Sequence, residues 1–206
     1  MILINRLVYK ILILSFGFSS SITVKESYDR LMNSSKPVHA TPHINNLIRN
    51  GFDNLNDNEK SNLSYIGLKE QNMRLTTLDP FLDQTHETEH FKFYFTLDGL
   101  DAVESIEYVT NMGLIFEQVW SFHIDTMGFD IPPLNANGLY EIRIENLPSF
   151  YFGYAVALGN GPTCESYIKM RNSYSSSQFN GQSEEDNIKV TAVHEFFHAI
   201  QFNYNC

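Results

Sequence analysis

The residues with the clearest chemical role lie near the C-terminal end of the 206-residue chain, in the segment His194-Glu195-Phe196-Phe197-His198. Two histidines four positions apart share one face of a helix at about 6 Å, close enough for both imidazoles to bind one Zn²⁺. Glu195 lies beside such an ion rather than on it, where its carboxylate can take a proton from metal-bound water. The pattern predicts His194 and His198 as zinc ligands and Glu195 as the general acid/base of a hydrolysis.

The segment that carries this pattern is expected to be a buried helix. Ser183-Glu184-Glu185-Asp186 matches a capping box, and residues 187–202 after it are mostly apolar. At about 100° per residue the polar side chains share one arc of about 120°. They are Thr191, His194, Glu195, His198 and Gln201. Burial of these polar side chains is unfavourable unless they bind a partner, and a metal ion would be such a partner. The alternative is that His194 and His198 are core histidines whose only partners are hydrogen-bonding groups.

The same pattern occurs a second time, in His86-Glu87-Thr88-Glu89-His90. Its interior residues are polar, and it continues directly into the alternating segment 91–97, which predicts a strand. In extended chain, residues four apart are separated by about 13 Å, too far for His86 and His90 to bind one ion. This copy is therefore not expected to form a metal site.

Around these motifs the hydrophobic pattern predicts an α+β fold. Strands are expected at 91–97, 140–145, 151–158 and 167–171, and a long helix from Asp101 to just before Gly128. Residues 22–80 are polar and weakly periodic, with short helices expected at 47–51 and 58–69. We expect a mixed or antiparallel sheet packed on the long helix and on the buried active-site helix.

The chain divides into three expected parts. Residues 1–21 have basic residues first, a short apolar run and then serines, the layout of a secretory signal peptide. A membrane anchor or a core strand is the alternative, but residues 11–18 are far fewer than the roughly 20 that a bilayer span needs. Residues 22–85 are an accessory segment or a pro-segment. Residues 86–206 are the catalytic subdomain, and the localisation is extracellular.

The net charge limits the classes of binding partner, and the two cysteines limit the possible disulfides. The chain has 24 acidic and 14 basic residues, a net charge of −10, which disfavours nucleic acid and anionic membranes. No stable membrane insertion is expected after signal cleavage. Cys164 and Cys206 are the two cysteines, and either one disulfide or two free thiols would fit. The sequence does not indicate an oligomeric state.

Residues 190–202 resemble the active-site helix of zincin metalloproteases, in particular a group of secreted bacterial-type zinc proteases whose helix follows HExFHAxQ. The resemblance extends over about residues 85–205. It implies a zincin-like fold, the assignments of His194, His198 and Glu195 given above, and a peptide or protein substrate added as a strand at a sheet edge. Residues 151–158 or 167–171 would supply that edge.

Two departures limit the resemblance. Gln201 and Tyr204 stand where the metzincin extension has Gly and His, so that subclass is excluded. The group is gluzincin-like, with a third ligand from a Glu on a later helix, so we expect that ligand beyond Cys206 and regard the catalytic subdomain as incomplete. His39, His43 and His123 are isolated in the sequence and are assigned no role.

The sequence therefore predicts a secreted zinc-dependent endopeptidase, or the N-terminal part of one, with Zn²⁺ as cofactor. Two alternatives remain. One is a catalytically inactive zincin-like module that serves as a secreted binding or structural domain. The other is a metal-binding protein without hydrolytic activity. Asp98, Asp101 and Asp125 do not have the spacing of a calcium-binding loop.

Overall fold

The structure is a computed structural model that describes residues 22–34, 38–71, 74–77, 80–148, 151–159, 161–175, 179 and 181–206. The helices are α2 (Val24–Asn33), α3 (Ala40–Asn54), α4 (Asp57–Asn62), the 3₁₀ helix η1 (Leu63–Ile66), α5 (Ile106–Trp120), the π-helix η2 (Ser121–Thr126) and α6 (Glu184–Tyr204). The strands are β1 (Leu68–Gln71), β2 (Arg74–Thr77), β3 (Gln84–Glu87), β4 (Phe91–Phe95), β5 (Tyr140–Glu145), β6 (Gly153–Leu158) and β7 (Glu165–Arg171). The predicted signal peptide, residues 1–21, lies outside the described residues.

The centre of the molecule is a five-stranded sheet in the order β3-β4-β5-β7-β6. β3 and β4 pair antiparallel, as do β6 and β7, whereas β5 pairs parallel with both β4 and β7. The predicted α+β class and the mixed sheet are therefore confirmed. β7 lies inside the sheet, whereas β6 is an edge strand.

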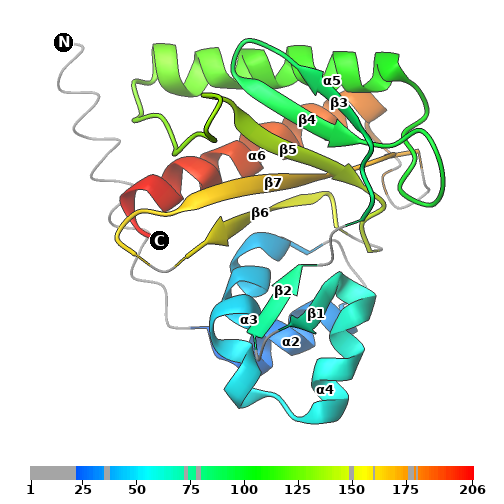
Figure 1. The fold of residues 1–206 in the computed structure, drawn as a ribbon, viewed down its shortest axis with the longest axis vertical. Coiled ribbons are helices and arrows are strands. Elements are labelled where there is room, and N and C mark those ends of the chain that lie inside the picture. The colour runs from blue at the N-terminus through cyan, green and yellow to red at the C-terminus, as the bar shows by residue number, and fades with distance from the viewer. Residues whose placement is uncertain are drawn as a thin grey trace.

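One face of the sheet is covered by α5 and α6 (Figure 1). The alternating phenylalanines of β4 point into this core, and Phe91, Phe93 and Phe95 are all buried there. The long helix begins at Ile106 and not at Asp101, because the Ser105 side chain caps it by accepting a hydrogen bond from the Tyr108 amide.

Residues 22–77, here called the N-terminal unit, form a second layer beside β6, on the side of the sheet away from α5 (Figure 1). The unit contains α2, α3, α4, η1 and the antiparallel β1–β2 pair. The predicted helix at 47–51 is the middle of the longer α3. The predicted helix at 58–69 ends earlier, at Ile66, because Gly67 takes up a left-handed conformation with φ of 75° and β1 follows.

The sheet joins the two layers because successive residues of a strand point to opposite faces. Ala155 and Ala157 of β6 belong to the core under α5 and α6. Tyr154 and Val156 belong to a second apolar cluster that contains buried leucine and isoleucine side chains of the N-terminal unit. The edge strand β6 is therefore packed on both faces.

The end of α6 is attached to the sheet by a disulfide. Cys164 and Cys206 are bonded, with their Cα atoms 5.6 Å apart. Of the two states that the sequence allowed, the structure shows the disulfide. No helix among the described residues is both long and apolar enough to cross a bilayer.

Candidate metal centre

The helix α6 presents the predicted motif as expected. Ser183 caps the helix by accepting a hydrogen bond from the Asp186 amide, and three acidic residues lie in the first turn, where the helix dipole favours negative charge. Phe196, fully buried, has its ring centroid 5.4 Å from that of Phe91 and 5.7 Å from that of Trp120. This packing fixes the rotation of α6 on the sheet and thereby the direction of the histidines.

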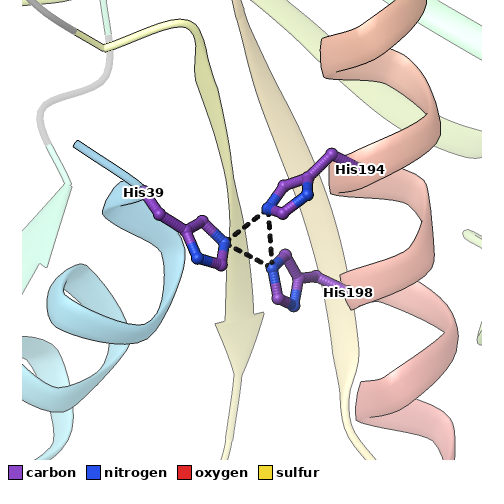
Figure 2. A group of neighbouring side chains, drawn as sticks. All are labelled: His39, His194 and His198. Atoms are coloured by element: carbon purple, nitrogen blue, oxygen red, sulfur yellow. Dashed lines mark hydrogen bonds between the residues drawn. The ribbon is translucent and has the colours of Figure 1, made fainter. Parts of the chain in front are cut away.

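A third histidine, from the N-terminal unit, meets the two histidines of α6. The Nε2 atom of His39 lies 2.5 Å from that of His194 and 2.7 Å from that of His198. The Nε2 atoms of His194 and His198 are 3.3 Å apart. Figure 2 shows the three rings pointing toward one another, His39 from the start of α3 and the other two from α6. Three nitrogen donors thus converge on one point.

The chemistry of this donor set fits a zinc ion. Burial and the neighbouring imidazoles lower the pKa of His39 to about 4 and that of His198 to about 3, and burial lowers that of His194. All three are therefore neutral at pH 7, as metal ligands must be. Nitrogen lone pairs that face one another at these distances repel unless a cation or protons lie between them. Zinc bound by three histidines plus water is a known catalytic arrangement.

The tautomer of His198 is set by a neighbour on the same helix. Its Nδ1 atom lies 2.7 Å from Gln201 Oε1, which can only accept, so Nδ1 carries the proton and Nε2 offers its lone pair to the centre. Part of the surface of His39 and of His194 stays accessible to solvent, although the rings face one another, and His198 is half-buried. A metal held here would therefore keep a coordination position open to water, as a catalytic site requires.

Glu195 is buried next to the three histidines, with 3% of its surface exposed. Its Oε2 atom accepts hydrogen bonds from Thr41 Oγ1 at 2.5 Å and from the Ala155 amide at 3.1 Å, while Oε1 lies 4.0 Å from His194 Nε2. Burial raises its pKa to about 7, against the opposing effect of these two donors. The group is thus a carboxyl with a pKa suited to proton transfer near neutral pH.

The outward edge of β6 lies between α3 and α6, and α3 side chains cover it. Asn45 Nδ2 donates to the carbonyl of Ala155 at 2.8 Å, and Asn45 Oδ1 accepts from the amide of Ala157 at 2.8 Å. The amide of Ala155 also donates to Thr41 Oγ1 at 3.0 Å. Three consecutive outward-facing polar groups of the edge are therefore satisfied by α3.

The second copy of the motif forms no comparable centre. His86 and Glu87 lie in β3, as extended chain, and His90 lies in the turn before β4. Donor atoms of Glu89, His90 and Glu117 do lie within 4.8 Å of one another. The Glu117 carboxylate, however, already accepts from Thr88 Oγ1 and from the His90 amide and ring, so it ties this turn to α5.

Sequence reasoning assigned no role to His39, which lies 155 residues before His194. A lone histidine in a polar segment gives no local signal, and only the packing of α3 against β6 brings it to the centre. The other two unassigned histidines make local contacts, His43 with Ser27 Oγ at 3.3 Å and buried His123 with the Val119 carbonyl at 2.9 Å.

His194, His198 and Glu195 thus lie together with His39, and the expectation of a third ligand beyond Cys206 stays a prediction. Comparison of the chain with protein-family models, with curated proteins and with solved structures gives no significant match.

Proposed function

We propose that the chain is a secreted zinc-dependent endopeptidase, or the N-terminal part of one. The observation that carries the proposal is the convergence of three imidazole Nε2 atoms, two of them from one HExxH helix, beside a buried carboxyl group. Three neutral histidines are a donor set that suits zinc, and a carboxyl group beside them supports the proposal of Glu195 as the general base.

Bound at this centre, zinc would acidify a water molecule and polarise the scissile carbonyl. His194 and His198 would hold it from α6, and Gln201 would keep His198 in the binding tautomer. Glu195 would take the water's proton on Oε1, since Oε2 is engaged by Thr41 and Ala155. The same carboxyl group would then pass the proton to the leaving amine.

The proposed substrate is an extended segment of a peptide or protein that pairs with a sheet edge beside α6. Of the two strands suggested by the sequence, β7 is internal and pairs on both sides, whereas β6 has one outward edge. We therefore assign the substrate to β6, next to Glu195. The disulfide fits an oxidising, extracellular compartment.

One observation favours the second candidate, a catalytically inactive zincin-like binding module. The Ala155 amide donates to Thr41 Oγ1 and Glu195 Oε2, and the Ala155 carbonyl accepts from Asn45 Nδ2. Neither outward group of Ala155 is therefore free to bond to a substrate. A chain permanently fixed in this arrangement would bind metal without cleaving peptides.

The test combines zinc content with peptide cleavage. The purified chain is expected to bind one zinc, Glu195→Gln to bind zinc equally well, and His198→Ala to lose it. In a quenched-fluorescence peptide library, any cleavage by the chain or by a longer form of it should be absent in Glu195→Gln. Failure of the wild-type chain to bind zinc would overturn the metal centre. Cleavage that survives in Glu195→Gln would exclude Glu195 as the base, and zinc binding with no cleavage in any form would favour the inactive module.

A further inference from the structure

We infer that the N-terminal unit is an intramolecular inhibitor, which closes the centre through His39, Thr41 and Asn45. These three residues, His39 just before α3 and the other two in its first half, are here called the α3 closure. The inference rests on the proposed function, since it concerns access of substrate to the same site. It assigns to residues 22–77 a regulatory role that their polar, weakly periodic sequence does not show.

The first contact of the α3 closure is with the metal ligands. The His39 Nε2 atom lies within 2.7 Å of both the His194 and the His198 Nε2 atoms, so it takes up one coordination position that a substrate carbonyl could otherwise use. His39 stands just before the first residue of α3 and is exposed. A ligand on the outer end of a separate helix can leave the centre without any change in α6.

The second contact is with the catalytic carboxyl group. Thr41 donates its hydroxyl hydrogen to Glu195 Oε2 at 2.5 Å, and Thr41 is itself buried at 2% exposure. The Ala155 amide donates to both groups, to Thr41 Oγ1 at 3.0 Å and to Glu195 Oε2 at 3.1 Å. A peptide that bonded to this amide would have to displace the Thr41 hydroxyl and the bond to Glu195 Oε2.

The third contact imitates a substrate strand. A strand added to β6 would bond to the amide and carbonyl of alternate residues, which are here Ala155 and Ala157. Asn45 bonds to the Ala155 carbonyl and the Ala157 amide with its side-chain amide, at 2.8 Å each. One asparagine side chain thus makes the hydrogen bonds that a peptide backbone would make.

The α3 closure therefore contacts the proposed metal ligands, the proposed base Glu195 and the outward edge of β6 at the same time. Buried polar groups need partners, which explains why β6 is capped when no substrate is present. The N-terminal unit is also attached by apolar packing on the opposite face of β6, at Tyr154 and Val156. Opening therefore requires displacement of α3 from the β6 edge, by cleavage of the unit or by movement of α3, and not a change in the sheet.

The experiment compares Asn45→Ala with Asn50→Ala, a matched change at an exposed position of the same helix. In the metal-free chain, NMR-detected amide exchange of Ala157 should be about tenfold faster in Asn45→Ala than in wild type, as expected for loss of a hydrogen bond, and unchanged in Asn50→Ala. Asn45→Leu, which has a similar size but no hydrogen-bond acceptor, should give the same direction if Asn45→Ala does not fold.

The second arm uses an extended alanine-rich peptide hydroxamate in excess zinc, with zinc occupancy measured separately for each variant. Both His39→Ala and Asn45→Ala are expected to bind this probe at least about tenfold more tightly than wild type, since each opens part of the α3 closure. Equal or weaker binding in both variants would overturn the inference and would mark His39 as a permanent ligand. Absence of zinc from the wild-type chain would instead overturn the proposed function, while the exchange arm would still decide whether Asn45 closes β6.

Discussion

Gln201 illustrates how a residue outside the metal-binding pattern controls it. Its carbonyl oxygen accepts from His198 Nδ1 at 2.7 Å, which leaves the Nε2 lone pair of His198 for the centre. Hydrogen bonds of this kind orient ligand imidazoles and raise their basicity. Gln201, which stands where the metzincin pattern has Gly, therefore orients the His198 ring.

Replacement of Gln201 should weaken zinc binding without unfolding the chain. In Gln201→Leu the zinc dissociation constant is expected to rise by about 10–100-fold, the usual effect of losing an outer hydrogen bond to a metal ligand. Competition with a chelator of known affinity measures it. Asn203→Leu, at a position of the same helix that bonds the Ile131 carbonyl, is the control and should leave zinc affinity unchanged. Equal affinities of wild type and Gln201→Leu would contradict the orienting role.

Residue types and spacing were enough to predict that His194, Glu195 and His198 lie together. His194, His198 and Glu195 follow from one helical turn, because i and i+4 positions share a face. His39 and Thr41 could not be predicted in this way, because their contacts with α6 span more than 150 residues and depend on the position of α3. Long-range packing of a weakly periodic segment leaves no pattern in the local sequence.

At the scale of elements, the Phe196 side chain fixes the position of α6 on the sheet. Phe196 has no exposed surface and packs its ring against Phe91, Trp120 and Tyr140. Since it lies between Glu195 and His198 in the sequence, its packing orients both of them. The direction of the α6 face that carries His194, Glu195 and His198 is therefore set by the packing of the opposite face.

Phe196→Ala is expected to lower the free energy of unfolding by about 3–5 kcal/mol, because it removes a large buried ring and leaves a cavity. Chemical denaturation followed by circular dichroism measures the change. Phe197→Ala, at a half-buried neighbouring position, is the matched control and should lower the free energy of unfolding by less. A loss of less than about 1 kcal/mol in Phe196→Ala would show that α6 is held by other contacts.

The β3–β4 turn is attached to α5 through Glu117, and this attachment should depend on pH. Despite desolvation, which raises it, the pKa of Glu117 is lowered below its usual value by hydrogen bonds from His90 and Thr88. A lowered folded-state pKa means that the stabilisation is complete above the unfolded pKa, about 4.3–4.5, and is lost as the pH falls through the folded value.

Glu117→Gln should therefore reduce the melting temperature by about 2–4 °C at pH 7, and the difference from wild type should be smaller at pH 3. Thermal melts at both pH values measure this. Glu89→Gln, at a carboxylate of the same turn whose side chain is 82% exposed, is the control and should change little at either pH. A difference that is the same at pH 3 and pH 7 would contradict the ionic role of Glu117.

The strands that carry β-branched and aromatic residues in alternation were predictable, because the two-residue period is a local property. The N-terminal unit was not, since β1 and β2 are short and α3 has a polar, asparagine-rich sequence. The start of α5 was predicted too early because Asp101 and Ser105 are both acceptable N-caps. Asp101 instead accepts from the amide of Asn146, the residue after β5, at 2.9 Å.

At the scale of the whole molecule, two apolar layers share one sheet, and a disulfide attaches the end of α6 to the segment before β7. The Cys164–Cys206 bond spans 42 positions of the chain. The helix α6 is therefore capped at its start by Ser183 and held near its end by a covalent bond. The N-terminal unit has no such covalent anchor among the described residues, which is consistent with a part that can move away.

Removal of the disulfide in a Cys164→Ser/Cys206→Ser chain should lower the free energy of unfolding by roughly 3–4 kcal/mol, mainly because the unfolded chain gains freedom. Zinc stoichiometry should be unchanged, since no cysteine contributes to the centre. Reduction of the wild-type chain should reproduce the loss, and unaltered stability after complete reduction would contradict a stabilising role.

The most direct test of the proposed metal centre is X-ray absorption at the zinc edge of the zinc-loaded chain. A first shell at about 2.0–2.1 Å with the scattering of three imidazoles is expected in wild type, and of two in His39→Ala at zinc saturation. His43→Ala, a change at the next histidine along the N-terminal unit, should leave three. A shell without imidazole scattering, or one that His39→Ala and His198→Ala leave unchanged, would contradict a centre formed by His39, His194 and His198.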